Sequence, residues 1–156
     1  MMTGNIQKTL FGAAFSPRMG LHGVLPAALC FAFIWPFGGG WKTVHMMAGN
    51  MTPGARGTIR FKIGDNGNTE LNITVRALAA PSSLTPPEDR YVVWIQPPGK
   101  PAHNLGALNI DSHENGELNT ETPDKRFTIF ITAEQNANES EPEGPTVLSA
   151  TVTQGA

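Results

Sequence analysis

The chain has 156 residues, enough for one domain of ordinary size with its own hydrophobic core. Its 17 glycines and 13 prolines make up about a fifth of the sequence, and such an abundance of turn formers favours many short strands over long helices. Of 11 basic residues only Lys8 and Arg18 precede residue 40, so the rest carries nine against 13 acidic residues, a net charge of −4. This charge excludes the basic footprint of a nucleic-acid-binding domain.

The first 40 residues have the pattern of a targeting segment. Two basic residues precede an uncharged apolar run over 24–37, which is shorter than the roughly 20 residues that a membrane-spanning helix needs. We therefore expect residues 1–40 to be a signal peptide, and the alternative is an uncleaved anchor over 21–41. Either way we expect the remainder to be exported, to the periplasm or beyond, with membrane contact only through this segment.

The next segment, residues 41–56, is rich in Gly, Asn, Thr and Pro towards its end and shows no clear periodicity. Such composition is typical of a connection between structured parts. We therefore expect a linker over 41–56 and a folded β-sandwich domain over 57–154.

A hairpin opens the predicted domain. Residues 58–63 alternate between apolar and polar side chains, and residues 70–78 alternate again, with Ala77 expected to face inward. Between them lies the sequence Asp-Asn-Gly-Asn, and Asn-Gly readily adopts the positive φ angles of tight hairpin turns. Two strands with one apolar face each predict an antiparallel sheet that is covered on one side.

Five further strands are expected, over 90–96, 104–110, 117–121, 127–133 and 146–152. The strand over 90–96 is apolar on both faces, so we expect it in the middle of a sheet and buried on both sides. The strand over 117–121 is mostly polar, as edge strands are. Seven strands in about 100 residues predict an all-β fold, an immunoglobulin-like antiparallel β-sandwich preceded by the apolar leader.

Short motifs of strand ends and turns lie in the second half of the chain. They read Tyr-x-Val-Trp-x-x-Pro-Pro-Gly at 91–99, Leu-Gly-x-Leu at 105–108 and Gly-Pro-x-Val-Leu-Ser at 144–149. A Phe-x-Ile-Thr-x-Glu pattern, with altered spacing, lies at 130–134. With these motifs residues 91–149 resemble the extracytoplasmic C-terminal domain of the anti-sigma-K factor family. The resemblance implies a β-sandwich outside the cytoplasm.

Members of that family place a cytoplasmic sigma-binding domain and one membrane helix before this sandwich. Too few residues precede the apolar run here to form such a domain, so we expect no sigma-binding activity.

No catalytic or metal-binding constellation is evident, and we expect neither a cofactor nor an enzyme. The four histidines share neither the i, i+2 nor the i, i+4 spacing of paired ligands, although His103 and His113 could meet across a hairpin. Oxygens near Asp65, or near Asp111, could hold calcium, but the chemistry of hairpin turns already accounts for these residues. The only cysteine, Cys30, lies in the leader, and no serine has a nucleophile elbow.

Three aromatic residues, Tyr91, Trp94 and Phe130, are the candidates for contact with a ligand or partner. A Trp in a central sandwich strand usually belongs to the core, whereas a sugar-binding face needs exposed aromatics in a row. We expect a non-enzymatic exported module for protein interaction, envelope structure or envelope sensing, with an envelope protein as its partner. The alternative is a carbohydrate-binding module that uses exposed aromatics on one sheet face.

Overall fold

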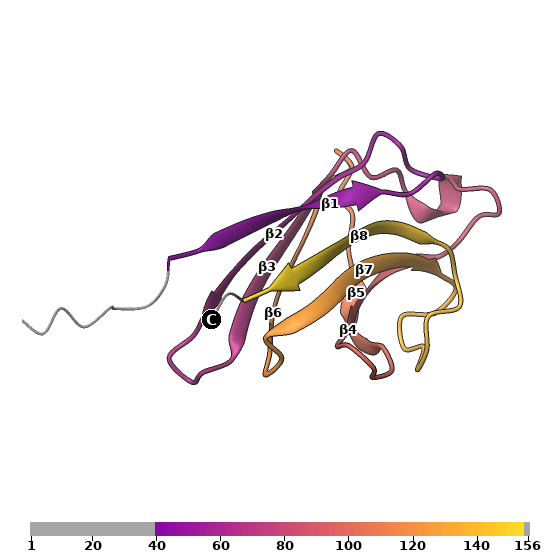
Figure 1. Ribbon diagram of the computed structural model, residues 1–156. Helices are drawn as coiled ribbons and strands as arrows, with labels where there is room; N and C mark the ends of the chain where they lie inside the picture. Colours follow the sequence, from indigo (N-terminus) through magenta and orange to yellow (C-terminus); the bar gives the residue numbers. More distant parts are fainter. Residues whose placement is uncertain (1–39, 155–156) are drawn as a thin grey trace, which may run out of the picture. The chain divides into compact units, whose positions relative to one another are not determined.

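The computed structural model of the chain describes residues 40–154, so the predicted leader over 1–40 lies outside the described residues except for Gly40 (Figure 1). The described part is all-β, as predicted, with one short 3₁₀ helix, η1 (Pro81–Ser83). Its strands are β1 (Lys42–Ala48), β2 (Arg56–Ile63), β3 (Thr69–Arg76), β4 (Arg90–Gln96), β5 (His103–Leu108), β6 (Gly116–Thr122), β7 (Arg126–Glu134) and β8 (Thr146–Thr153).

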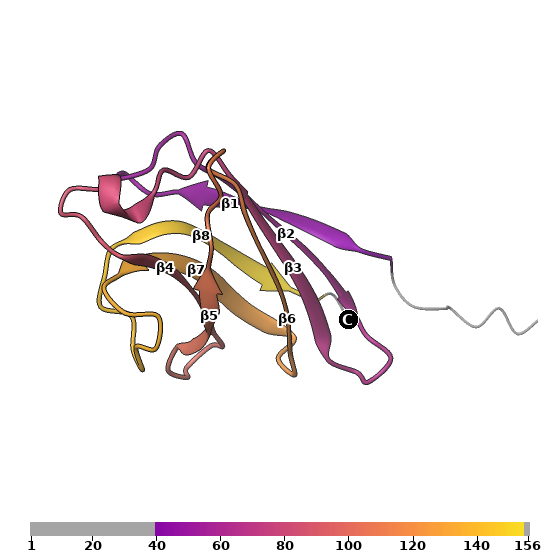
Figure 2. The same cartoon turned by 180° about the vertical axis from the view of Figure 1, so that it is seen from behind.

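The eight strands form one antiparallel sheet in the order β5-β4-β7-β8-β1-β2-β3-β6. β1 joins its two halves, because residues 42–46 pair with β2 while Met47 and Ala48 pair with β8. The sheet curls so that β5 and β6, at its two ends, lie side by side (Figure 2). A single bridge between Ile110 and Gly116 links the chain on either side of the turn between them. The sheet is therefore nearly closed.

β1 lies within the segment for which we predicted a linker, so the domain begins earlier than residue 57 and has eight strands rather than seven. Val44 and Met46 face the core, and Met46 is buried. Gly57 makes room for this burial, since a Cβ atom there would lie 2.6 Å from the Met46 sulfur. With only two inward apolar side chains, β1 carries a weak pattern, and its position depends on strands distant in sequence.

The predicted hairpin is formed by β2 and β3, which pair over their whole length. Gly67 has a positive φ, 78°, as expected for Asn-Gly, whereas Asn66 does not, so only one of the two residues adopts the predicted angle. The Asn66 side chain accepts a hydrogen bond from the Asn68 backbone N–H (2.9 Å), which fixes the turn.

The alternation predicted through residue 78 is wrong at Ala77. β3 ends at Arg76, and Ala77 is exposed with a left-handed φ of 51°. This reversal turns the next residue, Leu78, into the core, where its backbone N–H donates to the Glu114 carbonyl (3.1 Å). Glu114 is itself left-handed, with φ 60°. The left-handed conformation of Ala77, and not strand alternation, therefore directs Leu78 into the core.

β4 is the central strand that its apolar sequence predicted, lying between β5 and β7 with residues 91–95 all buried. Tyr91, Val93 and Ile95 join the hydrophobic core between the two halves of the sheet. Because neighbouring side chains alternate, Val92 and Trp94 point to the other side of β4. β6 lies at the end of the strand order, where its polar sequence led us to expect it.

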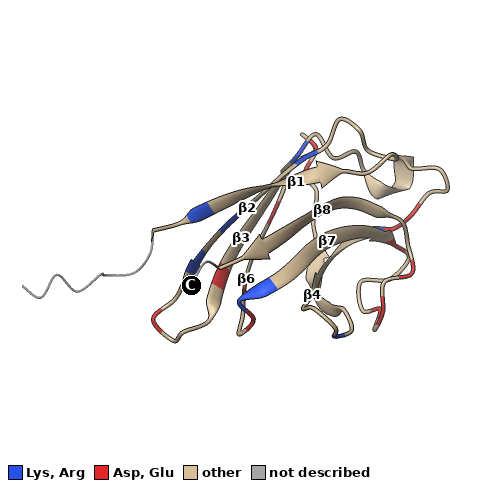
Figure 3. Ribbon diagram, viewed as in Figure 1, with Lys and Arg blue, Asp and Glu red and all other residues tan. Residues whose placement is uncertain are grey.

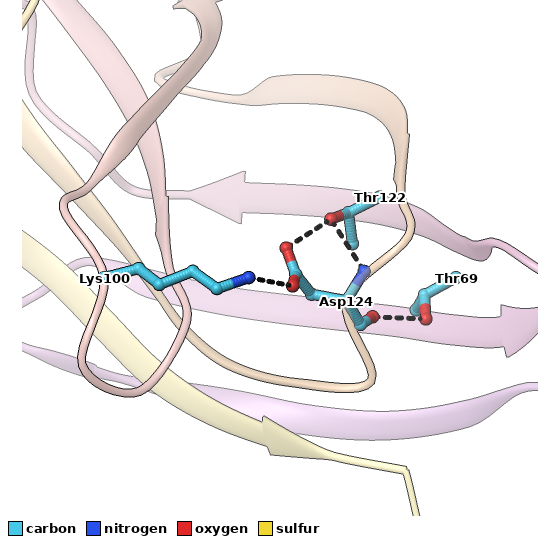
Figure 4. Close-up of polar contacts among 4 residues, drawn as sticks. All are labelled: Thr69, Lys100, Thr122 and Asp124. Atoms are coloured by element: carbon cyan, nitrogen blue, oxygen red, sulfur yellow. Dashed lines mark hydrogen bonds and ion pairs between the residues drawn. The ribbon is translucent and has the colours of Figure 1, made fainter.

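Polar contacts hold the β4–β5 connection to the turn after β6 (Figure 4). The buried Thr69 donates to the Asp124 carbonyl (2.8 Å), and the Thr122 hydroxyl donates to the Asp124 carboxylate (3.2 Å). Lys100 reaches the same carboxylate from the β4–β5 connection, at 3.6 Å. These contacts tie β3, β6 and the β4–β5 connection together, and we assign them a structural role.

Candidate functional site

Tyr91, the first predicted contact residue, is buried in the core. Its hydroxyl donates to the Ala79 carbonyl (2.8 Å) and so anchors the chain that follows β3. Burial raises the pKa of Tyr91 to about 12, with a further contribution from the charge of Glu114. Tyr91 is therefore a packing residue and is not available as a surface contact.

Trp94, the second predicted residue, is fully buried, although it points away from the main core. On the neighbouring strands its partners are Asn104 of β5 and Phe130 of β7. Its indole Nε1–H donates to the Thr132 hydroxyl (2.7 Å). A side chain on the outer surface of the sheet can be this buried only if another segment covers it.

We infer that the β7–β8 connection, residues 135–145, provides that cover, because Asn104, the partner of Trp94 on β5, hydrogen-bonds to it and the connection extends beside β4 in Figure 1. Asn104 donates from its amide to the carbonyls of Ala137 (2.9 Å) and Glu139 (3.1 Å) and so fastens the connection over β5. At the other end Gly144 lies against β7, where a Cβ atom would come within 1.6 Å of the Ala133 carbonyl oxygen. The glycine of the Gly-Pro motif is thus required by close packing.

A buried carboxylate completes the attachment. Glu134 is only 2% exposed, and its Oε1 accepts hydrogen bonds from the Thr132 hydroxyl (2.5 Å) and the Glu143 N–H (3.2 Å). Its Oε2 accepts one from the Gly144 N–H (2.9 Å). A continuous chain of hydrogen bonds thus runs from Trp94 through Thr132 and Glu134 to the β7–β8 connection. We assign these groups a structural role, and the sequence had pointed to Glu134 only as the last residue of the motif at 130–134.

The predicted aromatics do not form a sugar-binding row. Tyr91 and Trp94 are buried and Phe130 is half-buried. The prediction that these three side chains contact a ligand therefore fails for the first two, because one lies in the core and the β7–β8 connection covers the other. Within residues 40–154 the exposed aromatic is Trp41, with 43% of its surface accessible.

An open surface lies on the outward side of β1, β2, β3 and β6, and we call it the polar face. Register and alternation place four rows of side chains on it. Its members are Trp41, just before β1; Thr43, His45 and Met47 of β1; Arg56, Thr58, Arg60 and Lys62 of β2; Glu70, Asn72, Thr74 and Arg76 of β3; and Glu117, Asn119 and Glu121 of β6.

Charge is divided across the polar face. Basic side chains lie along β2 and at the end of β3, where Arg76 lies, and acidic ones lie at the start of β3 and on β6. Figure 3 shows the blue segments on β2 and the red segment on β3. The acidic groups are satisfied within the protein, since Glu117 accepts from the amides of Asn72 (2.6 Å) and Asn119 (3.1 Å). Glu70 pairs with Lys62 at 2.9 Å.

The exposed apolar groups of the polar face lie at the two ends of β1. Trp41 packs beneath the cationic groups of Arg60 and Lys62, which lie 5.1 and 5.2 Å from its ring centre. Met47, at the other end, is 77% exposed. Cationic and apolar groups therefore share one side of this surface.

A recess of about 550 Å³ opens at the Met47 end of the polar face. Arg56 and Arg76, direct partners in the β2–β3 register, lie side by side along it, and His45 contributes from β1. The His45 Nδ1 lies 3.5 Å from the Thr58 hydroxyl. In the described part of the chain the ion pairs are Lys62–Glu70 and Lys100–Asp124, and neither involves these two arginines.

The side chains considered as metal ligands are not gathered together in the part of the chain that the structure describes. Between residues 40 and 154 no three His, Cys, Asp or Glu side chains gather closely enough to hold a metal ion. Asp111, one of the oxygens considered for calcium, accepts hydrogen bonds from the backbone N–H groups of Asn115 (2.9 Å) and His113 (2.8 Å). These two bonds, that of Asn115 first, lower the pKa of the Asp111 carboxyl, and they make it part of a turn.

None of the described helices is long and apolar enough to span a membrane. Comparison of the sequence with models of known protein families and with curated proteins found no match.

Proposed function

We propose that the chain is an exported, non-enzymatic β-sandwich module that binds a protein partner through its polar face. The composition of that face supports the proposal. Trp, Met and Arg are the residues in which protein interfaces are enriched, and Trp and Arg dominate interface hot spots. Four such residues are exposed on the polar face and do not belong to the hydrophobic core: Trp41, Met47, Arg56 and Arg76.

The strand pairing supports the finer proposal of an immunoglobulin-like sandwich. β1 passes from β2 to β8, and a sheet divided at this strand would have β2, β3 and β6 in one layer and β5, β4, β7 and β8 in the other, as a sandwich of this kind requires. The resemblance to the outer domain of anti-sigma-K factors is part of the same proposal. It favours an envelope protein as the partner and a role in envelope structure or sensing.

Carbohydrate binding stays as a second candidate because of one observation. A hollow of about 460 Å³ lies beside Trp41 and is lined by Glu70, Asn119 and Glu121, groups that can bind sugar hydroxyls. A lone exposed ring that already packs against Arg60 and Lys62 makes this candidate weaker than protein binding.

Site-specific photo-cross-linking in the organism that encodes the chain tests the proposal. A photoreactive residue replaces Thr43, exposed on the polar face, and in a matched control it replaces Thr151, exposed on β8 in the other half of the sheet. We expect a discrete protein adduct at position 43 in the envelope fraction and none at 151. The same adduct from both positions, or a chain retained in the cytoplasm, would contradict the proposal.

A further inference from the structure

We propose that the recess between Arg56 and Arg76 binds a side-chain carboxylate from an acidic, extended segment of the protein partner. The inference rests on the proposed function, since it names the chemistry by which the polar face recognises that partner.

The first argument is the position of the two arginines. Arg56 and Arg76 face each other across β2 and β3, and both are exposed on the same side of the sheet. Like charges at directly opposed positions destabilise a sheet. A carboxylate between them would replace this repulsion with charge-assisted hydrogen bonds, and the guanidinium fork matches a carboxylate in shape.

The second argument is that, between residues 40 and 154, neither arginine forms an ion pair. Asp111 and Glu117 line a neighbouring hollow together with Arg76, but neither forms an ion pair with it. Glu117 accepts hydrogen bonds from the amides of Asn72 and Asn119, and Asp111 accepts from backbone N–H groups. Within the described residues Arg56 and Arg76 therefore differ from Lys62, which forms an ion pair with Glu70.

The third argument is the shape of the recess. Met46 and Ala55, both buried, contribute apolar walls, and ion pairs gain strength where water is partly excluded. A volume of about 550 Å³ exceeds the size of one carboxylate and leaves room for adjoining peptide. Arg60 lies four residues from Arg56 on the same face of β2, about 13 Å away, so an extended segment with repeated acidic residues meets both.

The test uses the full chain and an N-acetylated, C-amidated hexaglutamate peptide, followed by calorimetry and by NMR of the arginine side-chain N–H groups. Hexaglutamine, acetate and inorganic phosphate are titrated in parallel. The variant Arg56→Gln/Arg76→Gln removes the pair, and the control Arg90→Gln/Arg126→Gln removes the same charge from exposed positions at the starts of β4 and β7. Circular dichroism establishes that each variant folds.

We expect hexaglutamate to bind at least about tenfold more weakly to the Arg56/Arg76 variant, and within about twofold of the unmodified chain to the control. The arginine signals that shift should disappear with the Arg56/Arg76 substitutions. Equal weakening in both variants would show general attraction between charges and overturn the proposal. So would binding of phosphate as tight as that of hexaglutamate, which would indicate a site for a small oxyanion.

The cross-linking experiment separates this inference from the proposed function. An undiminished adduct at position 43 in the Arg56→Gln/Arg76→Gln variant would leave the polar face as the contact surface and overturn the carboxylate site. Specific hexaglutamate binding without any adduct at position 43 would support the recess and contradict the proposed function.

Discussion

Replacing Glu134 with Gln tests how the β7–β8 connection is held over Trp94. The substitution preserves the shape of the side chain but replaces one carboxylate oxygen with an NH₂ group. At present three donors point at the carboxylate, from Thr132, Glu143 and Gly144, at 2.5 to 3.2 Å. A glutamine oxygen can accept from only one side of the group, so at least one donor must face the NH₂.

The expected loss follows from these contacts. A hydrogen bond to a charged group contributes about 1.5–3 kcal/mol and one between neutral groups about 0.5–1.5, while a buried donor without an acceptor costs about 1–3 kcal/mol. Glu134 is 2% exposed, so water cannot fully replace the lost acceptor. We expect Glu134→Gln to lower the free energy of unfolding by about 2–4 kcal/mol, or the melting temperature by roughly 10 °C.

Urea unfolding followed by tryptophan fluorescence measures this loss. The control is Glu141→Gln, which neutralises an exposed carboxylate on the same connection and should change stability by less than about 0.5 kcal/mol. If Glu134→Gln also stays within about 0.5 kcal/mol, the buried carboxylate does not hold the connection and the reasoning is wrong.

Three further predictions concern stability and titration. Ala77→Gly should stabilise the domain by about 0.5–1 kcal/mol in urea unfolding, because Ala77 has φ 51° and glycine adopts this conformation without strain; a loss of stability would contradict the strain. Tyr91, the only tyrosine, should ionise near pH 12 by ultraviolet absorbance. Since the pKa of Tyr91 is raised from 10.0, the contribution of Tyr91 to stability should be complete below pH 10 and lost as the pH rises through about 12. Ionisation of Tyr91 near pH 10 in the folded protein would refute its burial. Lys100→Ala should change stability by less than about 0.5 kcal/mol, because the Lys100–Asp124 pair spans 3.6 Å in contact with water. Thr69→Val should cost about 1–2 kcal/mol, because it removes the hydrogen bond from the buried Thr69 hydroxyl to the Asp124 carbonyl. The reverse order in thermal melts would overturn the roles given to the two residues.

Local patterns were sufficient for much of the fold. The β2–β3 hairpin followed from alternation and the Asn-Gly turn, and β4 followed from its run of apolar residues. β1 was missed because Val44 and Met46 are its only inward apolar side chains, and because its pairing with β2 and β8 depends on distant parts of the chain. Ala77 was misplaced because alanine carries no signal for a left-handed conformation.

The candidate site was harder to predict. Trp94 was a candidate for ligand contact, with burial in the core as the alternative, and it is buried outside the main core. The polar β7–β8 connection on that side of the sheet has no sequence pattern typical of a covering segment. Arg56 and Arg76 meet through the β2–β3 register, which the hairpin turn already implies. Assigning residue 56 to a linker hid this pair, since a residue outside the sheet has no partner across it.

The polar face is tested most directly by comparing photo-cross-linking from positions 43 and 151 under identical conditions. A partner bound to the polar face yields a protein adduct from position 43 only, and the yield falls when Arg56 and Arg76 are both replaced by Gln. Adducts of equal yield from both positions, or from position 151 alone, would show that the partner binds elsewhere on the domain.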